Sequence, residues 1–73
     1  MTETLLAEMS ANVWKILVAP GDSVEEDQPL MILESMKMEI PVLSETDGVV
    51  VKVLVAEGDT IGPGQPLVEL STD

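Results

Sequence analysis

The stretch "ANVWKILVAPGDSVEEDQPLMILES" at residues 11–35 decides the fold, because it occurs a second time at residues 48–72 as "GVVVKVLVAEGDTIGPGQPLVELST". The two copies align without a gap at an offset of 37 residues, which places Lys15 on Lys52. A repeat of this kind is typical of one supersecondary unit used more than once. We therefore expect internal pseudo-two-fold symmetry.

Each copy contains two apolar runs rich in Val and Ile, separated by a Gly-Asp turn and resumed at Gln-Pro. β-Branched residues favour strands, Gly and Asp favour turns, and no run has helical apolar spacing. We expect strands at residues 5–9, 13–18, 29–35, 38–43, 49–55 and 67–70, with short bridges near Val24 and Ile61 that bring the number to eight. Two halves with one apolar face each should bury these faces against one another, as one flattened all-β sandwich or barrel over residues 1–73.

Composition excludes several classes of function. Fourteen acidic residues against three lysines give a net charge of −11, which argues against a nucleic-acid binder or a protein of anionic membrane surfaces. Histidine and cysteine are absent, so no ordinary metal site and no catalytic triad is expected. The apolar runs are too short to span a bilayer and the first ten residues are acidic rather than basic, so we expect a cytoplasmic protein.

The segment "LESMKMEI" at residues 33–40 joins the two copies and has no counterpart in the repeat. Because strands are expected on both sides of it, Met36 and Lys37 should form the tip of a hairpin. Tight turns normally use Gly, Asn, Asp or Pro, so Met-Lys is an unusual choice. Methionine is common where a flexible apolar surface meets another protein, which favours a recognition site around Lys37 over an ordinary solvated lysine.

Lys37 is poorly suited to act as a nucleophile by itself. A Schiff-base lysine loses its proton through burial or neighbouring cations, whereas Glu34 and Glu39 lie close to Lys37 in the sequence and favour the charged ammonium. Activation by a separate enzyme is therefore expected. Elsewhere, Trp14 aligns with Val51 in the repeat, and this alignment predicts a core position for the indole.

The tip "ESMKMEI", the Gly-Asp turns and the repeat together resemble the biotinyl/lipoyl attachment domain family over essentially the whole chain. The resemblance implies a flattened barrel-sandwich hybrid of two four-stranded antiparallel sheets, with the modified lysine on an exposed hairpin. It also implies the roles of the site residues: Lys37 as the biotinylated lysine, Met36 and Met38 as flanks recognised by the ligase, and Glu34, Ser35 and Glu39 as the surroundings in the hairpin.

The flanks favour biotin over lipoate as the cofactor. In lipoyl domains the lysine usually follows Asp and precedes Ala, whereas Met36 and Met38 match the biotin pattern on both sides. Ser35 stands where many biotin domains have Ala, a small change that should not impair recognition. Some biotin domains carry an inserted thumb in the first half, but residues 19–28 align on residues 56–65 without a gap, so no thumb is expected. The likeness is greatest to small free-standing biotinylated proteins.

The resemblance implies a biotin carboxyl carrier protein, which is a non-catalytic carrier and is expected to be monomeric by itself. A biotin protein ligase would attach biotin to Lys37, and the arm would swing between a separate biotin carboxylase and a carboxyltransferase. Two alternatives stay open, namely a lipoyl carrier domain and an unmodified adaptor domain of the same fold. A self-contained enzyme is disfavoured because the chain offers no base, nucleophile or metal-ligand set.

Overall fold

Short strands joined by turns make up the part of the chain that a computed structural model describes, residues 1–72. In chain order they are β1 (Thr2–Leu6), β2 (Ala11–Ile16), β3 (Ser23–Val24), β4 (Pro29–Ser35), β5 (Met38–Leu43), β6 (Gly48–Val53), β7 (Thr60–Ile61) and β8 (Pro66–Ser71). The bounds of β4 and β5 are those expected from the sequence, whereas β1 and β2 begin a few residues earlier than expected. Residues 1–72 include no helix long and apolar enough to cross a membrane, and the cellular location stays a prediction.

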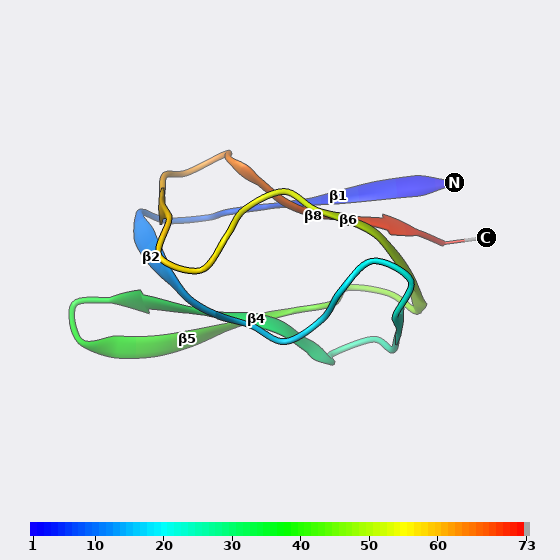
Figure 1. The fold of residues 1–73 in the computed structure, drawn as a ribbon, viewed down its shortest axis with the longest axis horizontal. Coiled ribbons are helices and arrows are strands. Elements are labelled where there is room, and N and C mark those ends of the chain that lie inside the picture. Colours follow the sequence, from blue (N-terminus) through cyan, green and yellow to red (C-terminus); the bar gives the residue numbers. More distant parts are fainter. Residues whose placement is uncertain (73) are drawn as a thin grey trace.

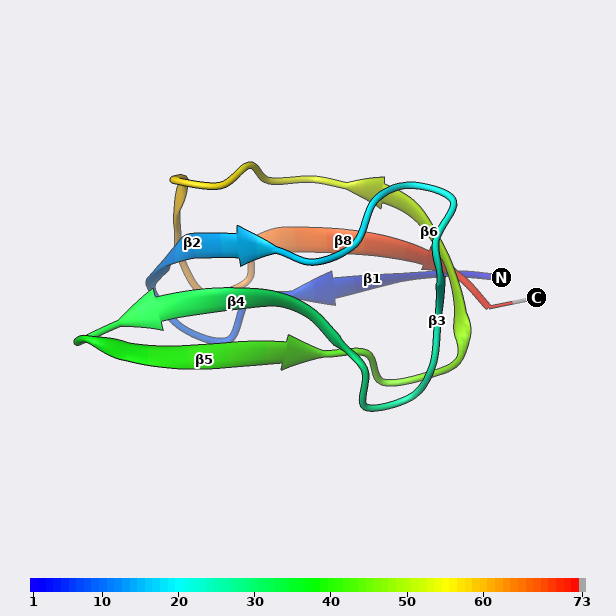
Figure 2. The ribbon, with the colours of Figure 1, turned by 60° about the horizontal axis from the view of Figure 1, so that its bottom comes forward.

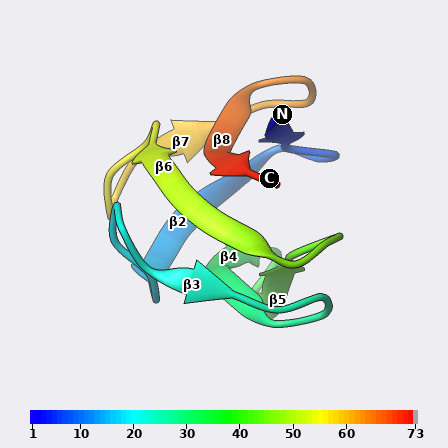
Figure 3. The same cartoon turned by 90° about the vertical axis from the view of Figure 1, so that its right-hand side faces the viewer.

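The strands form two four-stranded antiparallel sheets with the orders β1-β8-β6-β3 and β5-β4-β2-β7. The offset of 37 residues carries β2 onto β6 and β3 onto β7, and it carries the whole first order onto the second. The expected fold class and the pseudo-two-fold symmetry are therefore confirmed. Figure 3, a view down the long axis, shows the two sheets wrapped around a common interior.

The expected arrangement of the two halves was wrong in one respect. We expected each half to present one apolar face to the other, but each sheet takes two strands from each half. The repeated turns take part in this interleaving, because they hydrogen-bond to the opposite half. Gly21 N–H donates to Val50 O at 2.8 Å, and the equivalent Gly58 N–H donates to Val13 O at 2.8 Å. Neither half can therefore complete its backbone hydrogen bonds alone.

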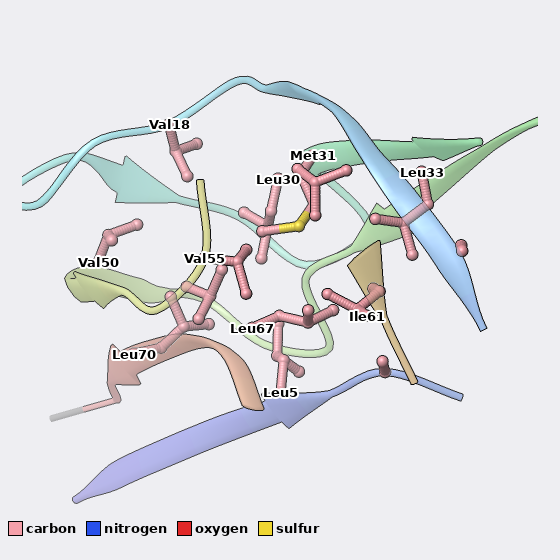
Figure 4. Close-up of a cluster of buried hydrophobic side chains, with 14 of the residues drawn as sticks. Leu5, Val18, Leu30, Met31, Leu33, Val50, Val55, Ile61, Leu67 and Leu70 are labelled. Atoms are coloured by element: carbon pink, nitrogen blue, oxygen red, sulfur yellow. The ribbon is translucent and has the colours of Figure 1, made fainter. Parts of the chain in front are cut away.

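The core lies between the two sheets, as Figure 4 shows. Its most deeply buried side chains come from equivalent positions of the two copies, with Leu30 and Leu67 both at 0% exposure. The full cluster is Leu5, Ala7, Ala11, Val13, Val18, Val24, Leu30, Met31, Leu33, Val50, Val55, Ile61, Leu67, Val68 and Leu70. Burial of these apolar side chains is the main favourable term for a domain this small.

β-Bulges at equivalent positions interrupt the alternation of side chains and correct the prediction for Trp14. The register shifts between Val13 and Lys15 in β2 and between Val50 and Lys52 in β6. A bulge adds one unpaired residue, so two neighbours can face the same side. Trp14 is 43% exposed, with the Lys15 ammonium 5.3 Å from its ring centroid, so it is not a core residue. Its repeat partner Val51 is 39% exposed.

The molecule is elongated, with extents of 36 × 18 × 17 Å. The hairpin of β4 and β5 occupies one end of the long axis, and the start of β1 and the end of β8 occupy the other (Figures 1 and 2). The symmetry relates the pair β4-β5 to the pair β8-β1. A turn joins β4 to β5, whereas no turn joins β8 to β1. The segment without a repeat partner thus forms one tip of the molecule.

Candidate functional site

A two-residue turn of Met36 and Lys37 closes the β4–β5 hairpin. Both residues have a left-handed backbone, with φ of 52° for Met36 and 63° for Lys37. Positive φ at both central residues is the requirement of the I′ turn, whose twist matches that of the flanking strands. Ser35 pairs with Met38 directly below the turn. The expected hairpin tip is therefore present at residues 36 and 37.

The side chains at the tip are open to solvent. Met36 is 92% exposed and Met38 is 61% exposed, and the Lys37 side chain is exposed between them. Within residues 1–72, the Lys37 ammonium makes no hydrogen bond or ion pair. Hydrophobic burial does not explain two methionines in such positions. The apex thus presents a primary amine between two thioether side chains.

Glu34 and Glu39 face each other across the hairpin, one rung below the Ser35–Met38 pair. Alternation along the strands places the two carboxylates on one face of the hairpin and Ser35 and Met38 on the other. Like charges directly opposite one another in a sheet are destabilising. The sequence analysis placed these acids near Lys37 but did not predict that they pair. A two-residue turn at residues 36 and 37 requires this pairing, because it sets the register of the hairpin.

The other two lysines occupy different surroundings. Lys15 and Lys52 lie within β2 and β6, at equivalent positions next to the bulges, and both are exposed. Their amines rise from the faces of the sheets, whereas that of Lys37 extends from the end of a hairpin. An enzyme that must enclose the acceptor amine can surround a hairpin tip more completely than a sheet face. This difference singles out Lys37.

The chemistry of the tip fits a group attached through an amide bond, because such a bond needs an accessible primary amine. The best-defined groove of the described residues lies away from the tip. This groove, of about 160 Å³, lies between β1 and β5, where Leu6, Met9 and Leu43 contribute to its lining, and none of the three residues 36–38 lines it. Among the described residues, no three acidic side chains are placed so that they could hold a metal ion.

Known proteins similar to this chain include two of solved structure and a small biotinylated protein. The biotinylated protein TB7.3 homolog of Mycolicibacterium smegmatis is 53% identical over 44 residues, or 60% of this chain and 62% of that protein. The crystal structure of Kluyveromyces lactis urea carboxylase matches with a TM-score of 0.91 and 32% identity, over 97% of this chain and 6% of that one. The lipoyl domain of the 2-oxoglutarate dehydrogenase complex from Azotobacter vinelandii matches with a TM-score of 0.79 and 28% identity, over 93% of this chain and 94% of that one.

The curated relatives are matched over only part of their length, since the aligned region spans 58% and 62% of two small relatives and 3% of a putative urea carboxylase. A family model covers more of the sequence. The model described as "biotin-requiring enzyme" matches residues 4–70, which include β2 to β7, most of β1 and β8, and the whole tip. The chain therefore belongs to the biotin/lipoyl attachment domain family, as the resemblance predicted.

Proposed function

We propose that this chain is a biotin carrier in which Lys37 is the acceptor lysine and residues 1–73 form one attachment domain. The observation that carries the proposal is the exposed amine of Lys37 on a turn with no turn-forming residue. The family description and the biotinylated relative support biotin as the covalently attached cofactor. When bound, biotin supplies a ureido nitrogen that carries a carboxyl group.

The chain's own residues contribute position rather than catalysis. The two-residue turn places Lys37 at the tip of the β4–β5 hairpin, and this hairpin lies at one end of the long axis. A biotin protein ligase would recognise Met36 and Met38 through their exposed apolar side chains. Glu34 and Glu39 would present a negative face beside the amine, which suits a basic surface on the partner. Deprotonation of the ammonium is left to the ligase.

The proposed carrier needs two partner enzymes. A biotin carboxylase and a carboxyltransferase, both separate from this chain, would load and unload the cofactor. The similarity to a urea carboxylase supports partners of the carboxylase class. Docking places the reactive atom near the partner's site, so loading should be more efficient than with free biotin. We therefore expect the biotinylated protein to stimulate ATP turnover by its cognate biotin carboxylase more than free biotin at equal concentration.

The first test replaces Lys37. Lys37→Arg keeps the positive charge and removes the amine that forms the amide bond, so biotinylation should be abolished with no change in folding. Intact-mass spectrometry after incubation with a biotin protein ligase, biotin and ATP measures the outcome. Lys15→Arg and Lys52→Arg are the matched controls and should each accept one biotin. A biotin mass increment that persists in Lys37→Arg would contradict the assignment.

A lipoyl carrier is the second candidate, and the structural match to a lipoyl domain favours it. The flanks distinguish the two. Met36→Asp with Met38→Ala converts the tip to the lipoyl pattern and should slow biotinylation strongly. Because these side chains are 92% and 61% exposed, the free energy of unfolding should change little. Mass spectrometry of protein from its native cell separates a biotinyl group, a lipoyl group and an unmodified adaptor.

A further inference from the structure

The five methionines of the chain differ widely in exposure. Met31 lies in the core at 0% exposure, Met9 is 39% exposed and Met1 is 83% exposed. The two next to Lys37 are also open to solvent, at 92% for Met36 and 61% for Met38. Oxidation of methionine requires contact between the thioether sulfur and the oxidant, so susceptibility follows exposure. Two sites of high susceptibility therefore lie on either side of the proposed acceptor lysine.

We propose that Met36 and Met38 form a methionine-oxidation site that controls attachment of the cofactor to Lys37. This inference rests on the proposed function, because it concerns recognition of the same tip. The oxidant is a neutral hydroperoxide, which the net charge of −11 does not repel. One oxygen atom is transferred in each event: the S–O bond forms as the O–O bond breaks, the sulfur loses two electrons, and hydrogen peroxide leaves as water.

Oxidation at this site changes recognition without unfolding the protein. Methionine sulfoxide is polar and chiral, and in a core it disrupts packing. Met36 buries almost none of its surface, so its sulfoxide removes little packing energy. Met31 reaches an oxidant only when the core opens. The folded protein therefore accumulates sulfoxides at Met1 and at the tip before the core is oxidised, with an intact scaffold and an altered flank on each side of Lys37.

Reversal is also possible at this position. Sulfoxide reductases restore methionine, with separate enzymes for the two sulfoxide epimers. A side chain at a hairpin tip with 92% exposure is accessible to such an enzyme in the folded protein. Attachment would then depend on the redox state of the tip. The Lys37 amine itself keeps its chemistry, because the oxygen atom is added to sulfur and not to nitrogen.

The experiment treats the unbiotinylated protein with hydrogen peroxide and removes the peroxide with catalase before the ligase is added. Peptide mapping by mass spectrometry should show oxidation of Met1, Met36 and Met38 before Met9, and of Met31 last, and the double leucine variant that serves as a control retains Met1. The initial rate of biotinylation should fall about tenfold as the tip is oxidised, since the apolar flanks become polar. Treatment with the two sulfoxide reductases should restore the rate.

Two controls separate recognition from damage. The double variant Met36→Leu with Met38→Leu keeps apolar flanks that cannot be oxidised, so peroxide should leave its biotinylation rate unchanged. Labelling of Lys37 with an N-hydroxysuccinimide ester reports the chemical reactivity of the amine, and it should be equal in the oxidised and untreated wild-type proteins. Circular dichroism should show the same fold in both.

The outcomes distinguish this inference from the proposed function. Complete oxidation of Met36 and Met38 with an unchanged biotinylation rate would overturn the inference and leave Lys37 as the acceptor. Oxidation of Met31 or Met9 ahead of the tip would overturn it as well. If peroxide lowers the biotinylation rate of the leucine variant as much as that of the wild type, the loss does not arise from Met36 and Met38, and the proposed oxidation site is rejected. Failure of the untreated wild-type protein to accept biotin would instead reject the proposed function.

Discussion

Gly-Asp turns and the Met-Lys turn both use a left-handed backbone, but the chain builds them from different residues. Gly21 and Gly58 have φ of 96° and 93°, values that glycine adopts without a steric penalty. Met36 and Lys37 have φ of 52° and 63° and carry full side chains. Each L-residue in this region costs roughly 1–2 kcal/mol. The Gly-Asp turns thus fit the backbone, whereas the tip retains residues that the backbone disfavours.

This difference separates turns that are explained by folding from a turn that is not. The Gly-Asp turns occur in both copies and make the same contacts to the opposite half, so they are explained by folding. The Met-Lys turn occurs once, makes no contact that would account for its residues, and is the most exposed part of the hairpin. A feature that folding does not explain and that breaks a symmetry is a candidate for function. Three predictions test this division.

The largest expected effect on stability is at the glycines. Gly21→Ala and Gly58→Ala should each lower the free energy of unfolding by about 1–2 kcal/mol, because a side chain is placed in a left-handed backbone. A Cβ would meet no atom within 4 Å at either position, so the penalty is conformational and should be equal in the two copies. Urea denaturation followed by circular dichroism measures it. Values that differ by more than the experimental error would contradict equivalent roles.

Loss of the aspartates should have a smaller effect. Asp22 Oδ2 accepts a hydrogen bond from Ala19 N–H at 2.9 Å, and Asp59 Oδ2 accepts one from Ala56 N–H at 2.9 Å. Asp22→Ala and Asp59→Ala should each destabilise the protein by about 1 kcal/mol, the typical net value of one such bond. Asp47→Ala offers a comparison without a repeat equivalent, since its Oδ1 accepts from Glu26 N–H at 2.8 Å. If only one of Asp22→Ala and Asp59→Ala destabilised the protein, the two Gly-Asp turns would not have equivalent roles.

Much of this architecture could be predicted because it follows from the sequence repeat. The offset of 37 residues predicts the equivalent Gly-Asp turns and the unmatched tip from the sequence alone. The exposure of Trp14 could not be predicted in this way. Its alignment with Val51 was correct, but both residues lie at bulges, and a bulge is a property of strand pairing that a periodic pattern does not reveal.

The interleaving of the halves was missed for a related reason. A repeat shows that two units are alike but not which strands pair between them, and hydrogen bonds such as Gly21 N–H to Val50 O are invisible in the sequence. At the site, the residue types of the tip indicated a family and a candidate lysine. The opposition of Glu34 and Glu39 followed from the register alone and was overlooked.

The smallest expected effect on stability is at the tip, and its sign is opposite. Met36→Gly removes the side chain from a residue with φ of 52° and should raise the free energy of unfolding by about 0.5–1 kcal/mol. Met36→Asn should act in the same direction, because Asn tolerates the left-handed region. Both variants delete an exposed thioether beside Lys37, so both should be biotinylated more slowly than the wild type. Urea denaturation and the initial rate of biotinylation, measured on the same preparations, give the two quantities. A variant that is more stable and is biotinylated as fast as the wild type would show that Met36 serves neither folding nor recognition, and the division drawn between the two kinds of turn would then fail at this residue.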